Sequence, residues 1–190
     1  MTMTQNLISV ESRRRKLANV EKANPNARII DVTSKADEPW VKFSPFYPHG
    51  DIPVPNSKNL TSQSVEGIWQ ALKVFESEGM DLSKLDVKNM KGIKRSVRTR
   101  GRVLGHQFGT DSDELLDYQT ARIQIYLPVY RLVLENCLSN EVDELRAILE
   151  FQPVVLLDYE TNSSITDLRK PLSHASLVAA FINEQWPAVE

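Results

Sequence analysis

The chain has 190 residues, of which 41% are hydrophobic and 25% charged, and its formal net charge is −2 at pH 7. A chain of this length can bury a core without disulfides, and its balanced charge excludes a strong overall attraction to nucleic acid or an anionic membrane. Its single cysteine, Cys137, excludes an internal disulfide and a paired-cysteine metal or redox site. No run of 18 apolar residues is present, so we expect no membrane association and a cytoplasmic protein.

The N-terminal residues 1–27 are predicted to form an extension outside the main domain. Within it, residues 9–22 are expected to form a weakly docked peripheral helix that carries the basic run at residues 13–16. Asn24-Pro25-Asn26 should stop this helix, because proline cannot continue it. We therefore expect one compact domain over residues 28–190, beginning with a β-branched strand at residues 28–33.

Residues 39–56 contain five of the ten prolines, with four aromatic residues between them. Proline removes backbone donors and fixes φ, so this segment cannot be a regular helix or a central strand. It is predicted to be an ordered loop pinned by its aromatic side chains, which are Trp40, Phe43, Phe46 and Tyr47.

The clearest predicted helix runs from Ser64 to Glu76. Five apolar residues follow the spacing of one helix face, namely Val65, Ile68, Trp69, Leu72 and Phe75. Ser62 or Ser64 is expected to cap its start, and Gly79 to close its far end.

Further helices are predicted in the C-terminal half. One block follows Asp113 and runs towards Ser139, with a kink or break at Pro128. The others are expected from residue 139 or 140 to about 150 and after Ser173, with a short apolar strand at residues 153–159 between them. Helices thus dominate and the strands are few and short, which is typical of an α+β domain.

Motifs of the common nucleotide, metal and hydrolase sites are absent from the sequence. The three histidines, His49, His106 and His174, lack the local spacing of a metal site, and we interpret each as a surface or loop-packing residue. The sequence therefore indicates no metal and no cofactor.

Glu66, Trp69, Gln70 and Lys73 fall within one sector of the predicted helix, at the edge of its apolar face. A carboxylate, an amide and an amine beside a tryptophan could form the lip of a ligand cleft. The alternative is an ordinary boundary between core and solvent, with Glu66 and Lys73 solvated.

Residues 91–102 form a second candidate site, because half of the twelve positions are basic. Arginine matches phosphate oxygens in a bidentate manner, and glycine lets backbone amides approach an anion closely. The segment would suit a phosphate-bearing small molecule or a nucleic-acid backbone, unless it is a solvated loop. Its basic residues are Lys91, Lys94, Arg95, Arg98, Arg100 and Arg102.

A third candidate is the polar stretch from Asp158 to His174, which contains Asp167. Loops that follow an apolar strand often frame a site. The alternative is a polar surface loop, unless the fold brings this stretch close to Glu66.

Two of these segments resemble motifs of the NADAR superfamily, whose members act on N-glycosidic bonds of ADP-ribose-like and ribosylamino compounds. The sequence FSPFYP at residues 43–48 and SVEGIWQALK at residues 64–73 keep the family's aromatic loop and its Glu, aromatic-Gln-Ala and Lys positions in register. Ile93-Lys94-Arg95 with Gly101-Arg102 is similar to a further family segment. Gly67 stands where the family usually has histidine, and residues 158–170 lack its tryptophan.

The resemblance implies a NADAR-like N-glycosidase of α+β fold. Its substrate would be a small-molecule nucleotide or an ADP-ribosylated compound, free or on nucleic acid. Glu66 would stabilise the positive charge that develops on the sugar or activate water. Alternatively, a lysine of lowered pKa, either Lys94 or Lys73, would form an imine with the ring-opened sugar.

Substrate-binding roles are expected for further residues of the same segments. Tyr47 or Trp69 would stack on a base, with Gln70 at the lip of the cleft. Arg95, Arg98 or Arg102 would hold a diphosphate, and Asp167 would open onto the same cavity.

Two other functions remain as alternatives. One is a non-catalytic module that binds ADP-ribose or a related nucleotide. The other is a nucleic-acid-binding or assembly protein that uses residues 13–16 and 91–102, for which we expect a strongly salt-dependent affinity.

Overall fold

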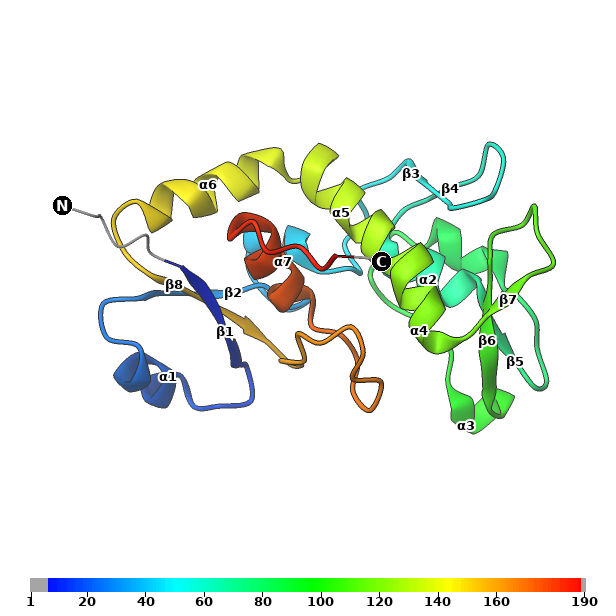
Figure 1. Cartoon of the computed structure of the whole chain (residues 1–190), viewed down its shortest axis with the longest axis horizontal. Helices are drawn as coiled ribbons and strands as arrows, with labels where there is room; N and C mark the ends of the chain where they lie inside the picture. Colours follow the sequence, from blue (N-terminus) through cyan, green and yellow to red (C-terminus); the bar gives the residue numbers. More distant parts are fainter. Residues whose placement is uncertain (1–6, 189–190) are drawn as a thin grey trace. The chain divides into compact units, whose positions relative to one another are not determined.

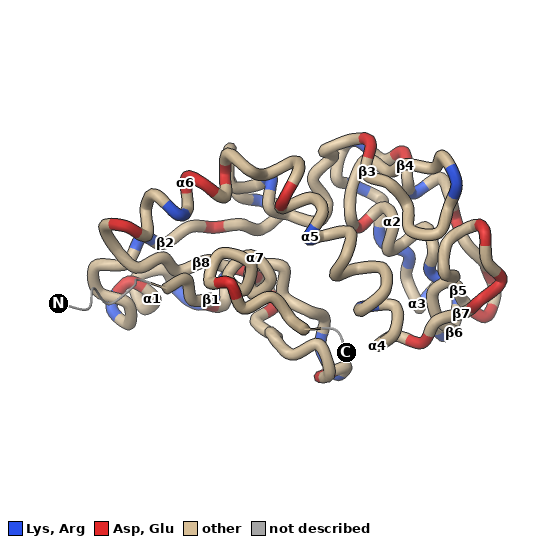
Figure 2. Tube along the Cα trace, turned by 45° about the horizontal axis from the view of Figure 1, so that its top comes forward, with Lys and Arg blue, Asp and Glu red and all other residues tan. Residues whose placement is uncertain are grey.

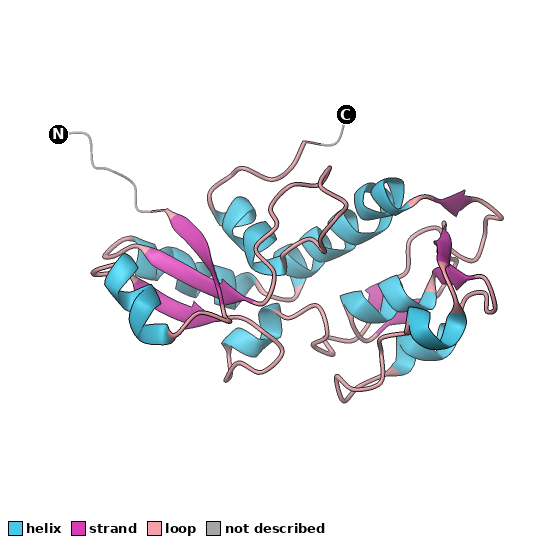
Figure 3. Ribbon diagram, turned by 90° about the horizontal axis from the view of Figure 1, so that it is seen from below, coloured by secondary structure: helices cyan, strands magenta, loops and turns pink. Residues whose placement is uncertain are grey.

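The computed structural model describes residues 7–188, which contain both helices and strands (Figures 1 and 3). The predicted α+β class is confirmed. The chain folds as two compact units: a continuous one, residues 45–133, and a discontinuous one made of the chain up to Ser44 and from Leu134 onward. The boundary predicted at residue 27 stays a prediction of the sequence.

The discontinuous unit is built on a three-stranded parallel sheet. Its strands are β1 (Ile8–Ser12), β2 (Arg28–Asp31) and β8 (Val154–Asp158), in the order β1-β8-β2. Ile8 and Arg28 both stand opposite Val154, so the last strand in the chain is the central one. The predicted strands at 28–33 and 153–159 are therefore confirmed.

The expected helix over residues 9–22 is wrong in its first half. Ile8–Ser12 is a strand, and only α1 (Leu17–Ala23) is helical. The alternation of Ile8 and Val10 with polar residues fits a strand, and the parallel partner that makes it one lies about 140 residues away in β8. This segment is thus a paired edge strand.

All five residues of the central strand, β8, are buried, because helices cover both faces of this sheet. Val155 and Leu157 pack with Val20 of α1 on one face. Side chains alternate along a strand, so Val154 and Leu156 point to the other face. That face contacts α6 (Ser139–Leu149) and α7 (His174–Ile182), while a 3₁₀ turn, η1 (Trp40–Phe43), contacts α7.

The continuous unit holds two small antiparallel sheets and short helices. One sheet pairs β3 (Ile52–Pro53) with β4 (Thr61–Ser62), and the other has the order β5-β6-β7. The bounds of its remaining elements are α2 Val65–Ala71, β5 Lys73–Phe75, η2 Leu82–Asp86, α3 Val97–Arg100, β6 Val103–Gln107, β7 Leu115–Leu116, α4 Tyr118–Ala121 and a π-helical segment Arg122–Tyr126. The next helix, α5 (Leu127–Asn136), begins in this unit and continues past its last residue, Val133.

The break expected at Pro128 takes the form of the π-helical segment that precedes it. Proline has no backbone N–H to donate to the preceding turn, and a wider turn accommodates this loss. The helical run begins later than predicted, after Asp117, whose side chain accepts a hydrogen bond from the Thr120 N–H.

The helix predicted from Ser64 to Glu76 ends at Ala71. Leu72 and Phe75 are buried as expected, but Lys73–Phe75 forms a strand that pairs with β6. A pattern of apolar residues cannot tell where a helix stops when a β partner lies far along the chain. Lys73 is consequently not on the same helix as Glu66.

No helix within residues 7–188 combines the length and the apolar character needed to cross a bilayer.

Candidate functional site

Helix α2 carries Glu66 in its first turn. The hydroxyl of Ser64 accepts the Gly67 N–H at 3.0 Å and caps the helix, and the Glu66 N–H donates to the carbonyl of Pro45 at 2.8 Å. The side chain of Glu66 is buried, with the residue 8% exposed. The proline-rich aromatic loop therefore directly fixes the start of the helix that presents this carboxylate.

Gly67 is required by close packing at the same turn. A Cβ at this position would lie 2.7 Å from the Ser62 hydroxyl and 2.8 Å from the carbonyl oxygen of Lys84. Contacts this short are not tolerated, so a histidine here would displace η2 from α2. The departure from the NADAR pattern at this position thus has a local packing reason.

Gln70 lies one turn after Glu66 and contacts it. Its Nε2 donates to Oε1 of Glu66 at 2.8 Å, and its Oε1 accepts the backbone N–H of Arg95 at 3.0 Å. Both the NH₂ group and the oxygen of this amide are therefore hydrogen-bonded within the protein, and the residue is 4% exposed. The sequence predicts that Gln70 contacts substrate at the lip of a cleft. In the structure, its amide is instead buried between Glu66 and the backbone of Arg95.

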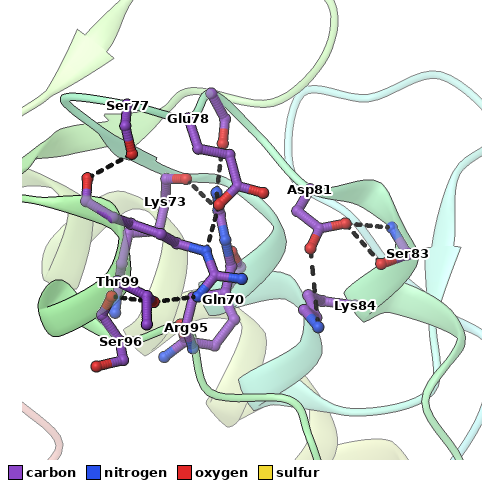
Figure 4. A network of polar contacts seen from close by, with 12 residues as sticks. Gln70, Lys73, Ser77, Glu78, Asp81, Ser83, Lys84, Arg95, Ser96 and Thr99 are labelled. Atoms are coloured by element: carbon purple, nitrogen blue, oxygen red, sulfur yellow. Dashed lines mark hydrogen bonds and ion pairs between the residues drawn. The ribbon is translucent and has the colours of Figure 1, made fainter.

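Arg95 does not occupy the position expected of a diphosphate ligand. Its guanidinium donates to the backbone carbonyls of Gln70 (3.0 Å), Lys73 (2.5 Å) and Gly79 (2.6 Å), and it pairs with Glu78 at 3.2 Å (Figure 4). Its side chain is fully buried, and it lies over the Phe75 ring. These contacts make Arg95 a clamp between α2 and the start of β5, and they occupy both terminal nitrogens of its guanidinium, while its Nε is buried without a hydrogen-bond partner among the described residues.

Lys73 lies on β5, where burial lowers the pKa of its amine. The positive charges of Arg95 and Lys94 lower this pKa further, whereas the carboxylate of Glu66 raises it. Four of the predicted site residues are therefore within electrostatic reach of one another. Within the described residues the amine of Lys73 has no hydrogen-bond or ion-pair partner.

Trp69 stands at the centre of an aromatic cluster. Its ring is 3.7 Å from that of His106, 5.9 Å from Tyr118 and 5.6 Å from Tyr126, measured between centroids. It is 8% exposed. The second turn of α2 is thus packed between β6 and the helical run that follows β7.

His106 was not expected in the site, and the interpretation as a surface or loop residue is wrong. It lies on β6, is 1% exposed, and neither of its ring nitrogens has a hydrogen-bond partner among residues 7–188. Burial, together with the charge of Lys73, lowers its pKa to about 3. Only the first two residues of Val103–Gln107 are apolar, so the composition of this stretch carries little signal for a strand.

Lys94 and the aromatic loop approach each other. The Nζ of Lys94 lies 5.3 Å from the centroid of the Phe46 ring, and the ring of Tyr47 packs against His49 at 4.9 Å. Such a cation–π contact is weak when solvent is near, and Lys94 is exposed. The sequence-predicted loop and the basic segment are therefore neighbours in the fold.

The other predicted binding residues are dispersed. Arg98 is exposed on α3, while Arg102 pairs with Glu76 at 3.4 Å. Asp167 belongs to the discontinuous unit, where its hydrogen bonds with Arg169 lower its pKa to about 2. The described contacts thus join Glu66, Gln70, Lys73 and Arg95, with Lys94 within electrostatic reach of Lys73, but they do not include these three.

The described residues hold no cluster of three or more histidine, cysteine, aspartate or glutamate side chains suited to a metal ion.

Residues 12–178 match the model of one protein family, which is described as Family of unknown function (DUF6939). The chain belongs to this family. No curated protein matches the chain.

Proposed function

We propose that the protein is an N-glycosidase that cleaves the bond between a sugar and an amine nitrogen in a nucleotide-like substrate, as the resemblance to the NADAR superfamily implies. The observation that carries this proposal is a buried carboxylate within electrostatic reach of a desolvated lysine. Glu66 is buried at the start of α2, and its charge reaches the amine of Lys73. A binding module needs no amine of lowered pKa.

The residues support a mechanism in which Lys73 is the nucleophile. In a glycosylamine the nitrogen lone pair opens the sugar ring and leaves an imine at C1. The neutral amine of Lys73 adds to this carbon, the departing amine takes a proton, and water hydrolyses the lysine imine to release the sugar aldehyde. Glu66 stabilises the positive charge that develops near C1.

The lowered pKa of Lys73 favours it as the nucleophile, since a lysine attacks only when its amine is neutral. Lys94 and Arg98, both exposed, are then free to face the phosphates of the substrate. Tyr47 remains the proposed surface for the base, because the ring of Trp69 is buried in its aromatic cluster. We place the reaction in the cytoplasm, because Cys137 has no partner for a disulfide within the sequence.

Trapping experiments test this proposal. The protein is incubated with ADP-ribosylated guanosine, ADP-ribosylated DNA or ribosylaminopyrimidine phosphates, with and without borohydride, and analysed by mass spectrometry. We expect release of the base and a reduced adduct on Lys73. Lys73→Met should lose both, whereas Lys88→Met, at an exposed position, should keep both.

The outcome also decides between the alternatives. Binding of ADP-ribose in calorimetry without turnover of any substrate would favour a non-catalytic module. Burial and ion pairing in the basic segment weaken the nucleic-acid alternative, because Arg95 is buried and Arg100 and Arg102 are paired with Glu78 and Glu76. Basic and acidic positions are interspersed along the chain (Figure 2).

A further inference from the structure

The side-chain amide of Gln70 has a single orientation, which its two partners define. Its NH₂ group faces the carboxylate of Glu66, and its oxygen faces the backbone N–H of Arg95. The flipped amide would set oxygen against carboxylate and NH₂ against N–H, which are two repulsive contacts. Both contacts are buried, so solvent does not relieve such a mismatch.

The backbone N–H that holds Gln70 is itself fixed. The guanidinium of Arg95 is bound to the carbonyls of Gln70 and Lys73, which lie at the end of α2 and the start of β5. Figure 4 shows Arg95 between these acceptors and Glu78. The carboxylate of Glu66 therefore stands at the end of a chain of contacts that begins in the segment carrying Lys94.

We propose that Gln70 is the positioning residue of this site, which orients the Glu66 carboxylate and ties it to the segment that carries Lys94. This inference rests on the proposed function only in assigning Glu66 to the reacting sugar. Gln70 acts through Glu66 and does not itself contact the substrate.

Gln70→Glu removes one of the two contacts and leaves the other. A carboxylate oxygen still accepts the Arg95 N–H, while the donor to Glu66 becomes a second carboxylate. Two adjacent carboxylates cannot both ionise freely, so one titrates at higher pH. In ¹³C-carboxyl NMR, we expect either the signal assigned to Glu66 or that of the introduced carboxyl to titrate at least about one pH unit above the wild-type midpoint of Glu66.

Gln124→Glu is the matched control, because it makes the same change at an exposed position. Its Glu66 signal should titrate as in the wild type. The signal is assigned by its loss in Glu66→Gln. Titration of both carboxyl signals at the wild-type Glu66 midpoint in folded Gln70→Glu would overturn the proposal.

A double variant tests the orientation, and serves equally if Gln70→Glu alone does not fold. Glu66→Gln/Gln70→Glu exchanges the two side chains and restores an amide–carboxylate hydrogen bond in reverse. We expect it to be as stable as the wild type but to have lost cleavage of the ribosylamino substrate. Restored cleavage would show that the position of the carboxylate is irrelevant and would overturn the inference.

Failure of the proposed function is recognised separately. If the wild-type protein cleaves no substrate, the glycosidase proposal fails. The NMR titration needs no substrate, so it still decides whether Gln70 positions Glu66.

Discussion

Lys73 and His106 stand opposite each other in the antiparallel pair of β5 and β6, and burial lowers the pKa of both side chains. Directly opposed residues of two antiparallel strands lie on the same face of the sheet. The charge of Lys73 contributes to the low pKa of His106, so the imidazole is neutral at physiological pH. This face of the sheet therefore holds a desolvated amine beside an uncharged ring.

Lys73 should react with amine reagents at lower pH than the exposed lysines. Only the neutral amine reacts, and burial with the charges of Arg95 and Lys94 lowers its pKa. Reductive methylation followed over pH by mass spectrometry gives a midpoint for each lysine. Lys88 is the reference, and equal midpoints for Lys73 and Lys88 would contradict the electrostatic account.

Glu66→Gln should lower the midpoint of Lys73 further, because the carboxylate of Glu66 raises the pKa of this amine in the wild type. The same variant should reduce glycoside cleavage by about 100-fold or more, as is usual when a group acting on the transition state is removed. Reductive methylation and turnover are measured on one preparation. An upward shift of the midpoint would show that the two groups do not interact as described.

His106→Phe should stabilise the fold. Phenylalanine has a similar planar shape, can stack on Trp69, and eliminates two buried nitrogens that lack partners within the described part of the chain. Each unsatisfied buried polar atom costs about 1 kcal/mol or more. We expect the free energy of unfolding in urea at pH 7 to rise by about 1–2 kcal/mol. A decrease would mean that the nitrogens have partners in solution.

Arg95→Met should destabilise the protein by at least about 2 kcal/mol, since three backbone carbonyls lose their donor. Arg98→Met, at an exposed position of α3, should change the free energy of unfolding by less than about 0.5 kcal/mol. Urea denaturation compares the two variants. Equal effects would contradict the clamp assigned to Arg95.

The discontinuous unit contains a buried ion pair with a defined pH dependence. His174 donates from Nδ1 to Asp158 at 3.0 Å, and its Nε2 lies 2.8 Å from the Val32 carbonyl oxygen. Both neighbours are acceptors, so both nitrogens carry protons and the ring is an imidazolium. Burial opposes both charges, but their mutual attraction and hydrogen bonds raise the pKa of His174 and lower that of Asp158.

The stability from His174 should be complete below its unfolded pKa of 6.5 and disappear as pH rises through the raised folded value. That from Asp158 should be complete above 3.8 and disappear as pH falls through its lowered value. Urea unfolding at pH 5–9 should show a decline above pH 6.5. His174→Gln should flatten that decline, and an unchanged slope would rule out this pair as its source.

Local patterns predicted much of the fold. The β-branched stretch before Thr33, the apolar strand before Asp158 and the Ser173 cap of α7 depend on neighbouring residues, and all three were found. The strands β1 and β5 were assigned to helices, because their partners lie far away in sequence. Long-range pairing overrides a local helical pattern.

In the candidate site, too, the features set by neighbouring residues were predicted, and those set by distant segments were not. Periodicity placed Glu66 and Gln70 together on α2, where the structure also has them. It also placed Lys73 beside them by assuming one continuous helix, whereas this lysine lies on β5. It could not show that Arg95 is inside the protein or that His106 contacts Trp69, because both depend on packing between segments 25 to 37 positions apart.

The order β1-β8-β2 has a consequence for synthesis on the ribosome. The two outer strands are translated first and do not pair with each other, and their shared partner emerges about 120 residues after β2. At ordinary translation speeds this delay is on the order of ten seconds. Residues 45–133 have all their strand partners by then, so the nascent chain carries two unpaired strand segments that a chaperone can recognise until Val154–Asp158 is made.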